Sequence, residues 1–201
     1  PLFFSGNITH PNFFVKSVFA FIVFSLIASS IYILNDYKDI EADQKHPEKK
    51  DRPLANGSIS KTTALFLFTT LISAVAMLVF FGQEYFHKNL WKFAVIIGSY
   101  FIMNLAYTFR LKHVAIVDIF IIAIGFVLRV LAGGYATGIK ISQWAILLTF
   151  VLALVLAVGK RRGELINAAI SGKTRKALDG YNVQFADIVL SISVTLAVIC
   201  Y

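Results

Sequence analysis

Apolar residues along the chain fall into six long blocks separated by polar segments. The hydrocarbon core of a membrane is about 30 Å thick, and a helix needs about 20 apolar residues to cross it. Five blocks have roughly that length, and a sixth is truncated by the end of the sequence. The sequence therefore predicts an all-α, polytopic transmembrane bundle with helices at Phe13–Leu34, Thr62–Gly82, Leu90–Phe109, Val114–Ala136, Ile141–Gly159 and Phe185–Tyr201.

The polar segments alternate between strongly and weakly basic ones. Residues 35–61, 110–113 and 160–184 hold 14 of the 19 Lys and Arg residues. Positive residues accumulate in cytoplasmic loops, and alternating crossings place these three loops on one face. We therefore expect a single helical domain over residues 1–201, with the three loops in the cytoplasm. The opposite side carries only Lys16, Lys88, Lys92 and Lys140.

Composition supports a membrane protein and excludes several other classes. Hydrophobic residues make up 58% of the chain, against roughly 45–50% in soluble domains, and only 15% is charged. Disordered chains, coiled coils and nucleic-acid-binding tails need a more polar sequence. The net charge of +8 is explained by the basic loops, so we expect no nucleic acid partner. The single cysteine, Cys200, excludes an intrachain disulfide.

Four polar residues follow the first apolar block. Asp36, Asp39 and Asp43 are spaced i, i+3 and i+7, so they share one face if the helix continues, with Asn35 beside them. Carboxylates on one face repel each other unless a cation binds between them. Hard cations such as Mg²⁺ prefer oxygen ligands, and they are commonly bound by protein carboxylates and substrate phosphates together. The pattern favours a magnesium site at Asp36, Asp39 and Asp43. The alternative is a polar helix end in contact with water.

Basic residues of all three loops are expected near these carboxylates. Cations around Mg²⁺ ligands are what a phosphate or diphosphate substrate requires, although the positive-inside rule alone explains many of them. Histidines show no metal-ligand spacing, and the sequence has no P-loop or GxSxG motif. The candidate phosphate-binding cations are Lys45, Arg52, Arg110, Lys112, Lys160, Arg161 and Arg162.

Two charged residues lie inside the fourth apolar block. Asp118 and Arg129 are eleven residues apart, about 16 Å along a helix, so each needs another partner. Asp118 is close enough to the cytoplasmic end to join the polar site. Arg129 is deeper, where it either serves a lipid phosphate or satisfies backbone carbonyls. Tyr107, one turn from Asn104, either lines the same cavity or makes an ordinary interhelical hydrogen bond.

The segment from Asn35 to Asp43, followed by the KxHPxKxxRP-like stretch Lys45–Pro53, closely resembles the first aspartate-rich motif of the UbiA superfamily of intramembrane prenyltransferases. Leu111–Gly134 and Gly159–Leu165 resemble the branch that comprises the decaprenyl-phosphate phosphoribosyltransferases. The resemblance runs over essentially the whole chain. Such proteins have about nine transmembrane helices. We therefore expect a piece of a longer protein that lacks the first helix and the last two.

The resemblance implies Mg²⁺-dependent transfer of 5-phosphoribosyl from phosphoribosyl diphosphate to a polyprenyl phosphate. Asp36, Asp39 and Asp43 would hold the metal, and Asn35 would orient them. Ordinary prenyltransferases of the superfamily carry a second DxxxD motif in the third loop. Here the residue four positions after Asp179 is Val183, so the DxxxD pattern fails, and the segment from Lys160 to Glu164 opens the loop. This departure favours the phosphoribosyl branch, with Glu164 in the phosphate site, over prenyl transfer to an aromatic acceptor. Cation transport is the second alternative, and a carrier would place its ionisable groups near the bilayer midplane, not at the membrane surface.

Overall fold

The computed structural model describes residues 2–3, 5–82, 90–171 and 180–201. The described residues form six α-helices and one short 3₁₀ helix, and all six α-helices are long and apolar enough to cross a membrane. This confirms the all-α transmembrane architecture. The elements are α1 (Pro11–Gln44), α2 (Lys61–Phe81), α4 (Leu90–Phe109), η2 (Leu111–His113), α5 (Val117–Thr137), α6 (Gln143–Ser171) and α7 (Val183–Cys200).

Local sequence signals account for several helix boundaries. Pro11 opens α1, where its missing N–H needs no helical partner. The side chains of Ser60 and Asn182 cap α2 and α7 by accepting hydrogen bonds from backbone N–H groups. Gly138 ends α5 at φ 76°, a left-handed conformation that favours glycine. These signals fix where three of the crossings begin and one ends.

Two helices are longer than hydropathy predicts. Helix α1 continues to Gln44, as the spacing of the aspartates requires, and α6 continues to Ser171, so that residues 160–171 are helical where the sequence predicted a loop. Hydropathy detects only the part of a helix that lies in lipid, whereas backbone hydrogen bonding continues into the polar part. The rest of the third loop, residues 172–179, lies outside the described residues. The extensions carry the Asp triplet and Lys160–Glu164 on rigid elements.

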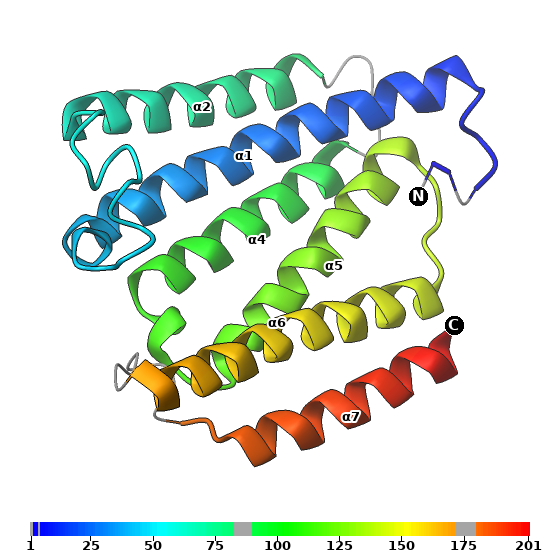
Figure 1. Cartoon of the computed structure of the whole chain (residues 1–201). Helices are drawn as coiled ribbons and strands as arrows, with labels where there is room; N and C mark the ends of the chain where they lie inside the picture. The colour runs from blue at the N-terminus through cyan, green and yellow to red at the C-terminus, as the bar shows by residue number, and fades with distance from the viewer. Residues whose placement is uncertain (1, 4, 83–89, 172–179) are drawn as a thin grey trace.

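The helices pack around two cores, and α1 lies between α2 and α4 (Figure 1). Helix α1 contacts α2, α4 and α5, while α5 contacts α6 and α6 contacts α7 (Figure 1). The first core includes Phe24 and Ile27 of α1 and Phe93 of α4. The second core joins α5, α6 and α7 through Ile119 and Val158. Helix α5 therefore connects both packing units.

The outer surface is apolar, as lipid contact requires. Phe21, Phe66, Leu156 and Val198 are 72%, 69%, 68% and 72% exposed. Exposed apolar area on this scale is unusual for a soluble monomer and normal for a lipid-facing surface. With six apolar helices of spanning length among the described residues, the chain is an integral membrane protein.

Candidate active site

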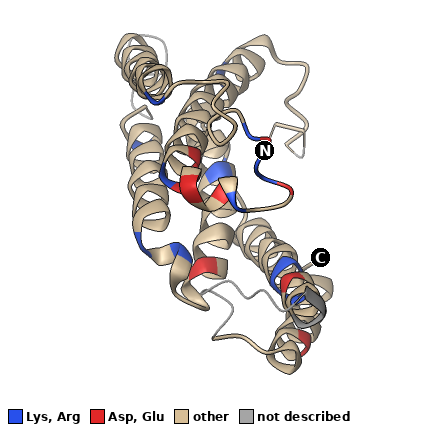
Figure 2. Ribbon diagram, turned by 60° about the vertical axis from the view of Figure 1, so that its left-hand side comes forward, with Lys and Arg blue, Asp and Glu red and all other residues tan. Residues whose placement is uncertain are grey.

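Charged residues gather at the end of the bundle where α1, α4 and α6 finish (Figure 2). Helices α1, α4 and α6 end, and helices α2, α5 and α7 begin, at this end of the bundle, as alternating crossings require (Figure 1). The structure therefore brings together the three segments that the sequence marked as basic. The candidate site is built from these segments.

Arg52 joins two of the three predicted metal ligands. Its Nη1 donates to Asp36 Oδ1 at 2.7 Å and to Asp43 Oδ2 at 2.9 Å. Asp43 is buried, whereas Asp36 and Arg52 are about one-third exposed. Helix geometry sets the two aspartates almost two turns apart on one face, and the segment after α1 folds back to place Arg52 between them. Two carboxylate oxygens thus converge on one cationic nitrogen.

The third aspartate binds a different cation. Asp39 forms an ion pair with the ammonium group of Lys112, which comes from η2. Lys112 is buried, with only 6% of its side chain exposed. An ammonium group with so little access to water needs a carboxylate partner. The shared face predicted for the triplet is therefore used by two different cations, Arg52 and Lys112.

A second charged cluster lies between α5, α6 and the segment before α7. Arg161 donates from Nε to Asp118 Oδ2 at 2.7 Å and from Nη1 to Glu164 Oε2 at 2.6 Å. Tyr181 donates to Asp118 Oδ1 at 2.5 Å. Asp118 and Arg161 are 0% and 4% exposed. This geometry disfavours the prediction that Asp118 and Arg161 bind phosphate, because their polar atoms already bind each other.

Burial of Tyr181 and its hydrogen bond to Asp118 raise the pKa of the tyrosine hydroxyl above its usual value near 10. The hydroxyl therefore stays protonated at physiological pH and remains a donor to the carboxylate. Asp118 thus has the partner that the sequence required for it.

The remaining predicted site residues occupy more open positions. Lys45, Arg110 and Lys160 are exposed, while Asn35 and Tyr107 are half-buried. Lys160 lies inside α6 and not at its end as predicted, because the helix continues to Ser171. Arg162 pairs with Asp187 of α7 at the surface.

Arg129 lies in a groove, away from the Asp triplet. Its guanidinium stacks over Phe24 at 5.2 Å and Phe126 at 5.3 Å. Stacking on aromatic faces is a third solution, beyond the lipid phosphate and the backbone carbonyls that the sequence suggested. The described residues provide no carboxylate partner for it.

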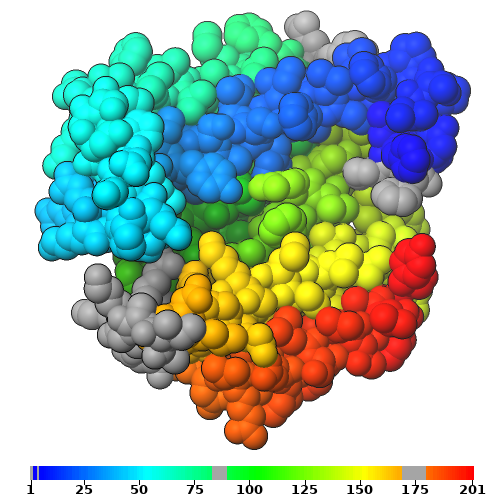
Figure 3. Space-filling view, in the orientation of Figure 1, coloured from blue at the N-terminus to red at the C-terminus, as the bar shows by residue number. Residues whose placement is uncertain are grey.

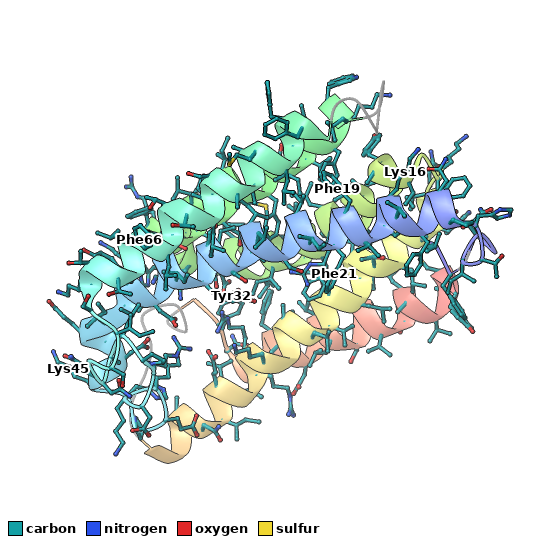
Figure 4. All side chains as sticks on the ribbon, turned by 90° about the horizontal axis from the view of Figure 1, so that it is seen from above. Lys16, Phe19, Phe21, Tyr32, Lys45 and Phe66 are labelled. Carbon is teal, nitrogen blue, oxygen red and sulfur yellow. The ribbon has the colours of Figure 1, made fainter. Side chains whose placement is uncertain are left out.

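The groove itself has a volume of about 600 Å³ and is lined mainly by α1 and α5. A hollow between α1 and α6 is visible in Figure 3, with α5 beneath it. Phe21 and Tyr32 project from the side of α1 that faces away from α2 (Figure 4). Ser25, Ser29 and Tyr32 line the groove, and Asp36 follows Tyr32 by one helical turn. The groove therefore leads toward the carboxylates.

Comparison with known proteins agrees with this architecture. Residues 3–159 match the family model of the UbiA prenyltransferase family. The chain belongs to the UbiA prenyltransferase family. This confirms the resemblance drawn from the aspartate motif.

Curated relatives in the UbiA family narrow the comparison. The chain is 43% identical over 183 residues to the decaprenyl-phosphate phosphoribosyltransferase of Mycolicibacterium smegmatis, covering 90% of this chain and 55% of that protein. It is 38% identical over 191 residues to the enzyme of the same name from Mycobacterium tuberculosis H37Rv, covering 92% and 60%. The chain thus spans a little over half the length of these relatives.

A solved structure gives the same fold. The UbiA homolog from Archaeoglobus fulgidus, bound to DMAPP and Mg²⁺, superposes with a TM-score of 0.71 at 17% identity. The match covers 92% of this chain and 63% of that chain. At this identity the likeness establishes the UbiA fold.

The donor atoms partly fit the metal that this neighbouring UbiA structure holds. A Mg²⁺ ion needs several oxygen ligands that converge on one point. Asp36 and Asp43 each supply one such oxygen, and the two oxygens converge on the position that Nη1 of Arg52 occupies. Asp39 contacts Lys112 and does not share that point. Within the ranges that the structure describes, no three His, Cys, Asp or Glu side chains are gathered as a metal cluster. The fit therefore rests on two of the three predicted ligands.

Sequence reasoning missed Tyr181, which joins the second cluster. It lies between Gly180 and Asn182, the cap of α7, in the segment treated as a basic loop. Nothing in the position of Tyr181, immediately before an N-cap residue, indicates contact with Asp118, which lies 63 residues earlier in the sequence. Only the packing of α6 and α7 on α5 brings the two together.

Proposed function

We propose that this protein transfers a 5-phosphoribosyl group from phosphoribosyl diphosphate to a polyprenyl phosphate and releases diphosphate. The observation that carries this proposal is identity of 37–43% over at least 183 residues to decaprenyl-phosphate phosphoribosyltransferases of three bacterial genera. The cluster of carboxylates and cations at one end of the bundle supports it, since both substrates are phosphate esters. Because the chain spans a little over half of these relatives, the activity is proposed for the protein as a whole.

Asp36 and Asp43 are proposed to hold Mg²⁺ against the donor diphosphate, with Asn35 orienting them. When bound, the metal would neutralise charge on the diphosphate leaving group. DMAPP and GPP, which the Archaeoglobus fulgidus UbiA homolog binds together with Mg²⁺, are likewise diphosphates. Asp39 of α1 and Lys112 of η2 would border this position.

Exposed cations would bind the phosphate groups. Lys45 and Arg110 directly follow α1 and α4, Lys160 lies in the second half of α6, and the three side chains are exposed. Arg52 is one-third exposed, so its guanidinium is accessible from the site. Positive side chains at the mouth of a site raise the local concentration of anionic substrates. The positive-inside rule assigns this end to the cytoplasm.

The groove along α1 and α5 would hold the hydrocarbon chain of the acceptor lipid. It is lined by Phe21, Phe24 and several small residues, and its α1 face leads to Asp36. A polyprenyl chain lying there would present its phosphate at the charged end. The lipid stays in an apolar environment, and its headgroup reaches the donor.

The transfer needs positioning and charge neutralisation more than proton transfer. A phosphate oxygen of the lipid forms a bond to C1 of the ribose, and the bond from C1 to the diphosphate oxygen breaks with its electron pair. A phosphate monoester is already anionic at neutral pH, so no general base is required. The residues of this chain would orient the two phosphates and exclude water.

A donor-competition assay tests the proposal. The full-length protein in nanodiscs receives Mg²⁺ and decaprenyl phosphate with either phosphoribosyl diphosphate or an isoprenyl diphosphate. We expect a phosphoribosylated lipid only with the first donor, and loss of turnover in Asp36→Asn. Glu41→Gln, an exposed carboxylate on the same helix, serves as the matched control and keeps its activity.

Transfer from isoprenyl diphosphates alone would replace the proposal with prenyl transfer. That alternative has some support, because the digeranylgeranylglyceryl phosphate synthase of Sulfolobus acidocaldarius is 30% identical over 142 residues. Cation transport is disfavoured, because the carboxylates lie at a helix end and a carrier needs its ion site near the bilayer midplane.

A further inference from the structure

The turn between η2 and α5 is strained. Ile116 has φ 70° and ψ −48°, and among the described residues it alone has a positive φ without being glycine. A β-branched residue rarely adopts this conformation, because its Cβ meets the backbone. Such a backbone persists only where neighbouring groups hold it. Ile116 therefore needs restraints from the elements packed against it.

Tyr181 provides one restraint. Its hydroxyl accepts a hydrogen bond from the backbone N–H of Ile116 at 2.6 Å and donates to Asp118 Oδ1. Tyr181 is only 7% exposed and Asp118 is fully buried. Ile116 itself is 43% exposed, so the restraint comes from the buried partner: the hydroxyl of Tyr181 is held by Asp118 and fixes the N–H of the turn by a charge-assisted chain of two hydrogen bonds.

Gly180 provides a second, independent restraint. A Cβ atom built on Gly180 would lie 2.4 Å from the Cβ of Ala115, which is closer than two carbon atoms can approach. The two backbones therefore meet at this point, and only glycine allows it. The segment before α7 contacts the turn both by packing at Ala115 and by hydrogen bonding at Ile116.

The turn between η2 and α5 also determines the position of η2. Lys112 lies three residues before Ala115, and its buried ammonium pairs with Asp39 of α1. A shift of the turn would move η2 and withdraw Lys112 from that carboxylate. A continuous chain of contacts therefore runs from Gly180–Tyr181 through the turn to Asp39.

We propose that Gly180 and Tyr181 are positioning residues, which hold the turn at residues 114–117 and thereby keep Lys112 beside Asp39. Their effect on catalysis rests on the proposed function, since it assumes that Asp39 and Lys112 border the donor site. Their effect on the position of Lys112 does not, and it can be measured without any substrate.

The first test labels lysines by reductive methylation and reads each site by mass spectrometry, using the full-length protein in nanodiscs. Lys160, which is exposed, is the internal standard. We expect Lys112 to be protected in the parent and to be labelled at least several-fold faster in Tyr181→Phe. Tyr135→Phe, at the opposite end of α5, is the control and leaves Lys112 protected.

The second test uses the contact at Ala115. Gly180→Ala introduces the clash, so it should also expose Lys112 to labelling or prevent folding. Adding Ala115→Gly removes the opposing Cβ and leaves the Cα at 3.9 Å, so the double variant should regain protection. Unchanged labelling of Lys112 in Tyr181→Phe and in Gly180→Ala would overturn the proposal. Failure of Ala115→Gly to restore Gly180→Ala would do the same.

The kinetic test separates this inference from the proposed function. Residues that orient a site residue contribute about 10- to 100-fold, so Tyr181→Phe should lower kcat/KM for phosphoribosyl diphosphate by at least about tenfold. The loss should fall mainly on the KM of the donor, with the KM of decaprenyl phosphate unchanged. If Lys112 becomes exposed in Tyr181→Phe but the parent protein shows no phosphoribosyl transfer, only the proposed function is contradicted. Unaltered kinetics in an active protein with exposed Lys112 would contradict the positioning role.

Discussion

Replacing Arg161 with Met tests whether this arginine supports the fold or binds phosphate. The guanidinium is 4% exposed and contacts both Asp118 and Glu164, and Asp118 is fully buried. Methionine keeps much of the volume but leaves the charge of Asp118 without its cation. Removing one partner of a buried ion pair typically costs about 3–5 kcal/mol. We expect Arg161→Met to lower the free energy of unfolding by that amount.

The neighbouring arginine offers a matched control. Arg162 pairs with Asp187 at the surface, where the two side chains are 41% and 51% exposed. Exposed pairs contribute about 0–1 kcal/mol, so Arg162→Met should change stability little. The assay is reversible unfolding in mixed SDS micelles, followed by helical circular dichroism. Loss of stability should be several-fold larger for Arg161→Met than for Arg162→Met.

A second variant distinguishes the lost charge balance from lost packing. Asp118→Asn removes the buried charge, so the double variant Asp118→Asn/Arg161→Met should be less destabilised than the sum of the two single changes. Equal effects of Arg161→Met and Arg162→Met, or strict additivity in the double variant, would refute the structural role. In that case, phosphate binding by Arg161 would again be the better interpretation.

Three further predictions concern the rest of the site. Arg52→Ala removes the cation from Asp36 and Asp43. In a thermal-shift assay, added Mg²⁺ should therefore raise the unfolding temperature of this variant more than that of the parent. An equal rise in both proteins contradicts a cation position shared by Arg52 and Mg²⁺. Ser29→Trp fills the groove, so the KM of decaprenyl phosphate should rise by roughly tenfold, about 1.4 kcal/mol, while the donor KM stays constant in initial-rate kinetics. The raised pKa of Tyr181 means that its stabilising contribution is complete below pH 10 and is lost as the pH rises further. The stability difference between the parent and Tyr181→Phe should therefore be constant from about pH 6 to 9 and shrink above pH 10, as measured by unfolding at each pH.

Hydropathy was sufficient to predict the membrane crossings, because the requirement for apolar surface in lipid is local to each helix. It failed at the ends of α1 and α6, where the helix leaves the membrane and its side chains become polar. Extension of α1 could be read from the i, i+3, i+7 spacing of its aspartates, which has meaning only on a helix. Extension of α6 through the basic segment had no comparable signal.

Pairing of the charges could not be predicted from sequence. Lys112 reaches Asp39 across 73 residues, and Arg161 reaches Asp118 across 43. Spacing determines which side chains share a helix face, but the partner depends on how α5 packs against α1 and α6. The sequence therefore identified a population of candidate cations without distinguishing the buried ones, Lys112 and Arg161, from exposed ones such as Lys160.

The free energy needed to open an ion pair increases with its burial, and this difference indicates which of these pairs a substrate can open. Arg52 and Asp36 are 36% and 32% exposed, so water solvates both charges when they separate, and such a pair is worth about 1 kcal/mol or less. The pair of Arg161 and Asp118 has no such access to water, and opening it would leave a buried charge at a cost of several kcal/mol. A phosphate-bearing substrate can therefore draw Arg52 away from Asp36 at small expense, whereas the bond from Arg52 to the buried Asp43 is costly to open unless another cation, such as Mg²⁺, takes its place. For this reason, substrate contacts should be sought at Arg52 and the exposed cations.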